Sequence, residues 1–345
     1  MRLSRTGIVV LTILLLAVPV VAHVPSFPVD NTTPERAVSV PDAVKSWSFY
    51  DRLGPGEVKY YRMSLEAGEQ LRVGTFTPQS DEFTPSFVVM SPSLDETGDV
   101  PTGVTVPEGM GAVVVEGERP DSASYEPFAP SANYQTASIT IPVEEETTYL
   151  VAVYDPVQRS GPAGVTVGYR EAFSVSEYVT VPFDLVQTHL WEGQHPLVVV
   201  GPFFFVVIGG LGYLRSRWNR TWTNTPVRVA LGVAGLAIVA SGVNTLVQMI
   251  LAVAQTGPTP AAFVTTAFVV VPLVSGGWVV TVALRDELTL SPGTRGGLVT
   301  SGVVSLLTWA GFIVGPAILV AVAVIPERLV SGEWTERRPR RQDSE

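Results

Sequence analysis

Hydrophobic residues follow two different patterns along this chain. From about residue 45 to residue 172 they occur in short runs that alternate with polar residues, and Gly, Pro and Asp separate the runs. Such runs, rich in Val, Tyr, Thr and Phe, predict β-strands. The predicted strands are SWSFYDRL, EVKYYRMSL, EQLRVGTFT, SFVVMSP, GAVVVEG, QTASITIPV, TTYLVAVYD and GVTVGYRE. Eight short strands without intervening helices favour an all-β sandwich over residues 45–172.

A second pattern begins at residue 196, where long apolar segments carry no Asp, Glu, Lys, Arg or His. The four segments are 196–214, 229–254, 261–284 and 296–325. Each is about as long as the roughly 20 residues that a membrane-spanning helix needs. The expected fold class is therefore an all-β sandwich domain followed by an α-helical membrane bundle of four helices over residues 196–325.

The remaining segments suggest how the chain is exported. Residues 1–22 begin with Arg2 and Arg5 and continue with a short apolar stretch, which is typical of a signal peptide. Cleavage after Ala22 would make His23 the first residue, while an uncleaved anchor is the alternative. We expect a Pro-rich lead-in at 23–44, a connector at 173–195 and a polar tail at 326–345.

Arginines predict the orientation in the membrane. Arg215, Arg217, Arg220 and Arg228 fill the first connection between apolar segments, so this loop is expected in the cytoplasm and the β domain outside. Two predictions for the tail disagree. Four spans place it outside the cell, whereas its five arginines favour the cytoplasmic side. A re-entrant hairpin over 296–325, interrupted at Gly315-Pro316, would place it inside. Our expectation is four spans and an outer tail.

The charge distribution separates the two regions further. Residues 23–194 hold 25 Asp and Glu against 9 Lys and Arg, whereas the whole chain has a net charge of −10. A uniformly acidic, lysine-poor surface is typical of proteins from halophilic organisms, and a cationic partner is the alternative explanation. Such a surface would repel phosphates, so we expect no nucleic-acid partner. The absence of cysteine excludes disulfides and thiolate sites.

Part of the β region resembles a known family. The segments YYRMSLEAGEQLRVGTF, PSFVVMSP, TTYLVAVYD and AGVTVGY are similar to the bacterial pre-peptidase C-terminal domain, a secreted β-sandwich accessory module. The resemblance covers about a third of the chain and implies binding, or a folding and anchoring role, without catalysis. No protease sequence accompanies it here, and a membrane region follows.

Polar residues on the second apolar segment form one candidate site. Ser241, Asn244, Thr245 and Gln248 lie on one helical face together with the small residues Ala230, Ala234 and Ala237. Small and amide side chains at this spacing commonly join neighbouring membrane helices. The alternative is a polar lining for a permeating solute. No ionisable residue lies at membrane depth, which disfavours ion-coupled transport.

Two further candidate sites lie outside the membrane segments. His189, Glu192 and His195 could bind copper or zinc, with His23 as a further ligand, provided that the segment bends, because on a straight helix the two imidazoles diverge. Asn31 begins the glycosylation sequon Asn31-Thr32-Thr33 in the lead-in, where we expect it to be accessible.

No catalytic set accompanies these candidates. Nucleotide-binding motifs and the HExxH zinc-protease pattern are absent from the sequence, so we expect no cofactor and no enzymatic activity. The sequence favours a multi-pass protein of the cell membrane whose exported domain binds a partner or a cell-envelope component. The alternatives are a channel or transporter subunit and an extracytoplasmic copper- or zinc-binding protein.

Overall fold

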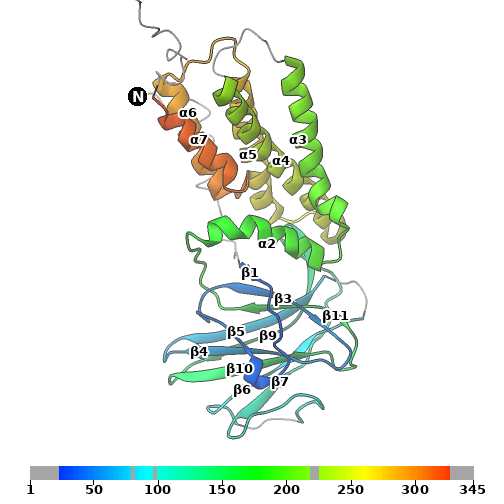
Figure 1. Ribbon diagram of the computed structural model, residues 1–345. Helices are drawn as coiled ribbons and strands as arrows, with labels where there is room; N and C mark the ends of the chain where they lie inside the picture. Colours follow the sequence, from blue (N-terminus) through cyan, green and yellow to red (C-terminus); the bar gives the residue numbers. More distant parts are fainter. Residues whose placement is uncertain (1–22, 79–81, 96–98, 218–224, 327–345) are drawn as a thin grey trace, which may run out of the picture. The chain divides into compact units, whose positions relative to one another are not determined.

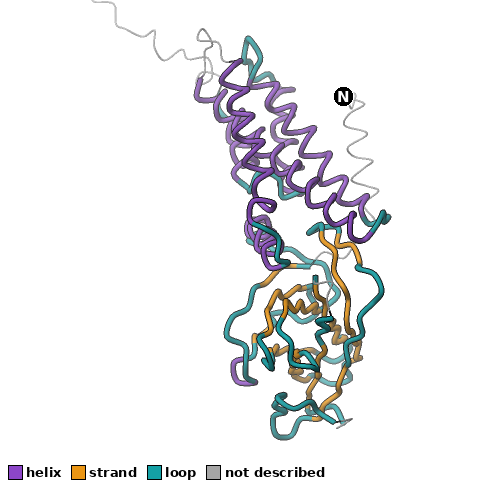
Figure 2. Tube along the Cα trace, turned by 90° about the vertical axis from the view of Figure 1, so that its right-hand side faces the viewer, coloured by secondary structure: helices purple, strands orange, loops and turns teal. Residues whose placement is uncertain are grey.

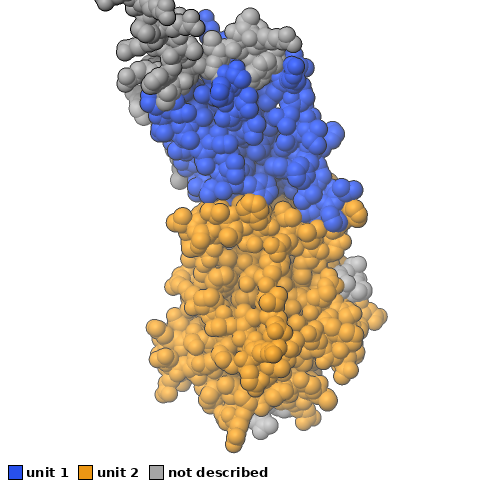
Figure 3. Space-filling model, in the orientation of Figure 1, with its two compact units in different colours: residues 1–12, 196–247, 266–345 blue, residues 13–195, 248–265 orange. Residues whose placement is uncertain are grey.

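The computed structural model describes residues 23–78, 82–95, 99–217 and 225–326 (Figure 1). The predicted signal peptide and all but the first residue of the predicted tail lie outside these residues. The chain forms two compact units (Figure 3). One, the β unit, contains residues 23–195 and 248–265; the other, the helical unit, contains the described residues of 196–247 and 266–326. We describe each unit by itself.

The β unit contains two sheets (strands orange in Figure 2), and each of the eight predicted segments overlaps one of their strands. The six-stranded sheet has the order β1 (Val24–Ser26), β3 (Trp47–Leu53), β11 (Gly161–Val167), β5 (Gln70–Thr77), β9 (Ser131–Pro142) and β8 (Ser124–Glu126). The five-stranded sheet has the order β2 (Val38–Ser39), β4 (Lys59–Leu65), β10 (Thr147–Tyr154), β6 (Ser86–Ser91) and β7 (Gly111–Val115). All pairs are antiparallel except β1–β3 and β2–β4.

Both sheets contribute to one hydrophobic core. Phe49 of β3 and Tyr61 of β4 belong to it, and their rings lie 5.2 Å apart. The five-stranded sheet is covered on its other face too, where Tyr60 and Met90 join a second cluster with the segment around residues 100–110. This double burial explains why β6 and β10 are almost continuously hydrophobic instead of alternating. Each fully buried side chain of this size contributes about 1.5–3 kcal/mol.

Residues 23–44, predicted as a lead-in to the domain, are part of it. β1 pairs with β3, β2 pairs with β4, and a 3-10 helix (Pro34–Arg36) lies between them. Val24, Val40 and Val44 are at most 8% exposed. The short strands escaped the sequence pattern because two or three residues are too few to show alternation.

The predicted connector also belongs to the β unit. Residues 177–191 form helix α2 (Glu177–Trp191), which begins after Ser176 and is followed by the C-cap Glu192 and by Gly193 with positive φ. Near its start Glu177 forms an ion pair with Lys45, and both side chains are largely buried. At its end Trp191 packs against Tyr50 and Phe76. The helix is therefore attached to the domain at both ends.

Three helices within the described residues are long and apolar enough to cross a membrane: α3 (Pro196–Arg217), α4 (Thr225–Thr256) and α5 (Ala262–Ala283). In the helical unit α4 and α5 meet at glycines. A Cβ atom on Gly235 would lie 2.9 Å from the main-chain oxygen of Gly276, and one on Gly276 would lie 2.7 Å from that of Gly235. Small residues thus bring the two backbones together.

The fourth predicted helix, 296–325, is two helices instead of one. α6 (Pro292–Leu307) and α7 (Val314–Val324) flank a turn in which Trp309, Phe312 and Ile313 have positive φ angles. The chain reverses there, and Arg295 at the start of α6 donates hydrogen bonds to the main-chain oxygens of Ala323 (2.6 Å) and Ile325 (2.7 Å). These 16 and 11 residues therefore form a helical hairpin whose two ends meet.

Candidate functional site

The end of α2 folds back on itself. Gly193 adopts φ +88°, its N–H donates to the oxygen of Leu190 (3.1 Å), and the N–H of Gln194 donates to the oxygen of His189 (3.2 Å). This pair of bonds is the Schellman motif, which glycine favours because positive φ costs it nothing. The turn carries Gln194 back over the last turn of the helix.

Three polar side chains meet as a result. His189 Nδ1 lies 3.0 Å from Glu192 Oε2, and Gln194 Nε2 donates to the same oxygen at 3.0 Å. Gln194 Nε2 also lies 3.4 Å from His189 Nδ1. His189 and Glu192 are 5% and 6% exposed in their side chains, so this is a buried polar cluster.

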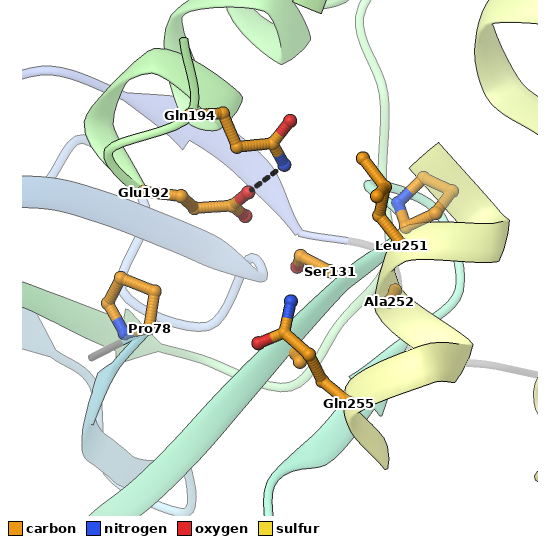
Figure 4. A pocket seen from close by; sticks show the side chains of 9 residues that line it. Pro78, Ser131, Glu192, Gln194, Leu251, Ala252 and Gln255 are labelled. Carbon is orange, nitrogen blue, oxygen red and sulfur yellow. Dashed lines mark hydrogen bonds between the residues drawn. The ribbon is translucent and has the colours of Figure 1, made fainter. Parts of the chain in front are cut away.

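A small cavity lies beside this cluster in the β unit (Figure 4). Its volume is about 70 Å³, and its lining residues are Pro78, Pro130, Ser131, Ala132, Glu192, Gln194, Leu251, Ala252 and Gln255. Figure 4 shows Glu192 and Gln194 on one side, with Ser131 and Gln255 across from them. Within the described chain, Glu192 Oε1 and Gln194 Oε1 are buried without a hydrogen-bond donor. We call this space the α2-end cavity.

A second carboxylate lies close to the cavity. Glu126 of β8 pairs in register with the cavity residue Ser131, and it accepts a hydrogen bond from the N–H of Phe128 (3.1 Å). Desolvation raises the pKa of Glu126 to about 7, the main-chain hydrogen bonds from Phe128 and Ala129 oppose this shift, and the negative charge of Glu192 adds to it. Two carboxyl groups therefore lie near one another at the cavity, and burial favours the neutral form of Glu126.

Trp191 fixes the end of α2 to the six-stranded sheet. Its indole N–H donates to the main-chain oxygen of Asp51 (2.6 Å), and its ring lies 5.0 Å from that of Tyr50 and 5.8 Å from that of Phe76. The contacts explain why Glu192 and Gln194 occupy defined positions. They also show that Trp191 packs within the β unit.

The ends of two long helices contribute to the same unit. Residues 248–265, which end α4 and begin α5, belong to the β unit. Thr265 Oγ1 accepts a hydrogen bond from the hydroxyl of Tyr125 (2.8 Å) and donates one to the main-chain oxygen of Pro127 (2.7 Å). Leu251, Ala252 and Gln255 of α4 line the cavity. The helix ends are thus joined to β8 and the loop that follows it.

The structure brings together two of the four predicted metal ligands. His189 and Glu192 are in contact because residues three apart lie on the same face of a helix, whereas His195 is exposed beyond the turn at Gly193. No group of three or more His, Asp or Glu among the described residues is arranged to hold a metal ion. A copper or zinc site formed with His23 remains a prediction that this geometry does not support.

The accessibility expected of Asn31 is wrong. Its side chain is 0% exposed, and its Nδ2 lies 3.5 Å from the main-chain oxygen of Tyr60. The main chain of Asn31 also accepts a hydrogen bond from the N–H of Tyr60 (2.8 Å). A glycan at this atom requires the folded segment to open, because the sequon lies within the domain and not in a lead-in.

The polar face of α4 packs partly against the helical hairpin. Ser241 Oγ donates to the main-chain oxygen of Ala237 (3.1 Å) and accepts from the N–H of Gly311, in the turn between α6 and α7 (2.9 Å). Thr245 donates within its own helix, to the oxygen of Ser241 (3.0 Å). Gln248, at the other end of this face, is 1% exposed. Asn244 Oδ1 is buried without a hydrogen-bond donor among the described residues.

Sequence reasoning missed most of the α2-end cavity. Glu192 was singled out, but Gln194, Ser131 and Gln255 come from segments 60 or more residues apart, and their types carry no motif. The one usable signal was Gly193 after a helix, which predicts a turn at that point. No protein-family model matches this chain. No curated protein shows significant sequence similarity to it.

Proposed function

We propose that this is a non-enzymatic, multi-pass protein of the cell membrane whose extracytoplasmic β-sandwich binds a partner or a cell-envelope component. The observation that carries the proposal is the hydrogen-bonded junction of Thr265 with Tyr125 and Pro127. Through it the end of α4 and the start of α5 form part of the folded β unit.

An ordered surface favours recognition. Association costs less conformational entropy when the residues of the binding surface are ordered before the partner arrives. The two hydrogen bonds of Thr265 order β8 and the loop that follows it in this way. The resemblance to the pre-peptidase C-terminal domain supports the same interpretation, because it implies binding or anchoring without catalysis.

The arginines support the proposed orientation. Arg215 and Arg217 end α3, and Arg228 lies in the first turn of α4, so both helices have their basic ends at the connection between them. Basic residues of short loops favour the cytoplasmic side. The opposite end of α4, which belongs to the β unit, then lies outside the cell together with the domain.

The α6–α7 hairpin bears on the membrane topology. Helix α7 has only 11 residues, which span about 16 Å at 1.5 Å per residue and fall short of a bilayer core of about 30 Å. A re-entrant hairpin after three spans would return the chain to the side on which α6 begins. We therefore favour three spans and a cytoplasmic tail over four spans and an outer tail, in agreement with its arginines.

The experiment uses the absence of native cysteine. Thr102→Cys and Glu145→Cys place single thiols at exposed positions of the β unit, and Val320→Cys provides a control on α7. The full-length variants are treated with a thiol-specific photo-crosslinker in native membranes at high salt. A discrete heteromeric product from a β-unit position, absent from the control, is expected. Self-crosslinking alone, or turnover of an envelope substrate that point mutation abolishes, would contradict the proposal.

A channel or transporter subunit is the second candidate, and Asn244 is the observation that favours it. An amide oxygen buried without a donor could accept a hydrogen bond from a permeating solute. The contact of Ser241 with Gly311 favours a structural role for part of the same face. Solute flux into liposomes that Asn244→Ala plus Gln248→Ala leaves unchanged would count against the lining.

A further inference from the structure

The α2-end cavity has more hydrogen-bond acceptors than donors. Glu192 Oε2 receives one hydrogen bond from Gln194 and lies beside His189, but Glu192 Oε1 receives none within the described chain. Gln194 uses its amide nitrogen for that bond, which leaves its oxygen without a donor. Ser131 Oγ already accepts from Asn133 Nδ2 (3.0 Å). Glu192 Oε1 and Gln194 Oε1 are therefore two acceptors that lack a donor, while Figure 4 draws the amide nitrogen of Gln255 toward this space, so its oxygen faces the cavity once the amide is turned by 180°.

Buried acceptors without donors destabilise the folded protein unless a ligand binds in the cavity. A buried polar atom without a partner costs about 1–3 kcal/mol, and a buried charge costs more unless it is paired. The side chain of Glu192 is only 6% exposed, and the nearby Glu126 adds a second acidic group. A water molecule could satisfy one oxygen, and His189 pairs with the charge of Glu192 only when its imidazole is protonated. A cation would satisfy both requirements.

We propose that the α2-end cavity binds one monovalent metal cation, Na⁺ or K⁺, through Glu192 Oε1 and Gln194 Oε1, with Ser131 and Gln255 completing the oxygen shell. Hard cations take oxygen ligands, and amide and hydroxyl oxygens suit the alkali metals. The volume of about 70 Å³ accommodates an ion and a water molecule. This inference goes beyond the proposed function and does not depend on it.

Other ligands fit the donor set less well. Ca²⁺ takes six to eight oxygen ligands, commonly several carboxylates, whereas Glu192 is the one acidic residue among those that line this cavity. Copper and zinc prefer nitrogen or sulfur, and among the described residues no group of three or more His, Asp or Glu could hold a metal ion. A single negative charge surrounded by neutral oxygens matches a single positive charge.

The site would connect three parts of the β unit. Glu192 and Gln194 follow α2, Ser131 begins β9, and Gln255 lies in the last turn of α4. A cation held between them would link these segments in the folded state and have no such site in the unfolded chain. Binding to the folded state alone raises the thermal stability as the ion concentration increases.

The test measures thermal unfolding of the full-length protein in detergent while NaCl replaces choline chloride at constant total salt. Wild-type Tm is expected to rise by about 5 °C in a saturable way, because constant total salt holds general screening steady. KCl is tested in parallel and CsCl serves as a size control, with less stabilisation expected from the larger ion. Equal Tm values in sodium, potassium and choline would overturn the proposal and indicate a cavity that holds water only.

Single substitutions test which residues the sodium-dependent rise in Tm requires. Glu192→Gln removes the charge and is expected to abolish the sodium-dependent rise, whereas Glu145→Gln removes an exposed charge and should preserve it. Gln194→Met keeps Glu192 and should move the midpoint to about tenfold higher Na⁺, so it tests the site even where Glu192→Gln fails to fold. A full sodium response in Glu192→Gln or an unchanged midpoint in Gln194→Met would place the ion elsewhere.

Discussion

Arg295 Nη1 donates to the main-chain oxygen of Ile325 at 2.7 Å, which joins the first turn of α6 to the end of α7. The same guanidinium binds the oxygens of Ala323 (2.6 Å) and Leu290 (2.9 Å). A cation at the C-terminal end of a helix satisfies carbonyl groups that lack intrahelical donors and interacts favourably with the helix dipole. One arginine thus closes the hairpin that replaces the predicted fourth helix.

Arg295→Gln should open the hairpin. The variant loses charge-assisted hydrogen bonds to two segments, so we expect the free energy of unfolding to fall by about 2 kcal/mol. Chemical denaturation in detergent would measure the change, with Arg217→Gln as a control at an exposed position of α3. An equal loss in the control would mean that charge at the membrane surface, and not the hairpin contact, is responsible.

The position of the tail can be tested separately. In intact cells, Ser344→Cys should resist a membrane-impermeant maleimide and react after permeabilisation, because a re-entrant hairpin leaves the tail in the cytoplasm. Thr259→Cys, in the connection between α4 and α5, is the outer control and should react in both states. Labelling of Ser344→Cys in intact cells would restore the topology of four spans with an outer tail.

Gly276→Leu should separate α4 from α5. A Cβ atom at this position would lie 2.7 Å from a main-chain oxygen of α4, which cannot move as a side chain can. Overpacking of this kind costs about 1–3 kcal/mol, and the measurement is thermal unfolding in detergent. Gly277→Leu is a matched control on the next residue, where no heavy atom lies within 4 Å. Equal effects of the two substitutions would exclude a specific α4–α5 contact.

The raised pKa of Glu126 predicts that the free energy of unfolding depends on pH. Its pKa in the folded state, about 7, is above the value of about 4.3 for an unfolded chain, so the folded state holds the proton to higher pH. This group therefore lowers the stability progressively as pH rises from about 4.5 to 7, with no further change above that.

Glu126→Gln should remove that loss, so the variant is expected to be more stable than wild type at pH 8 and similar at pH 4.5. Denaturation across this range would show a difference on the order of 1–2 kcal/mol at the upper end. The control Glu118→Gln alters an exposed carboxylate and should follow wild type. If the free energy of unfolding of Glu126→Gln equalled that of wild type at all pH values, desolvation of Glu126 would not contribute to the pH dependence of stability.

Trp191→Ala should release the end of α2 from the sheet. The substitution removes two ring contacts and the hydrogen bond to Asp51, and we expect a loss of about 3 kcal/mol. Hydrogen exchange of the amides at 189–194 should accelerate as well. The neighbouring Leu190 is 40% exposed, so Leu190→Ala should change stability by less than about 0.5 kcal/mol.

Local pattern alone determined the eight longer strands and the three long helices. A strand buried on one face alternates, a membrane helix is continuously apolar, and neither signal requires a distant residue. Tertiary structure decided the rest. A two-residue strand such as β2 exists only because β4 offers it a partner. The apolar run 296–325 became a hairpin because Gly311 and neighbouring residues adopt positive φ and because Arg295 and Ser241 hold the ends and the turn. Likewise, Glu192 meets Ser131 and Gln255 at one cavity only after the sheets, α2 and the end of α4 have packed, and no sequence spacing records that meeting.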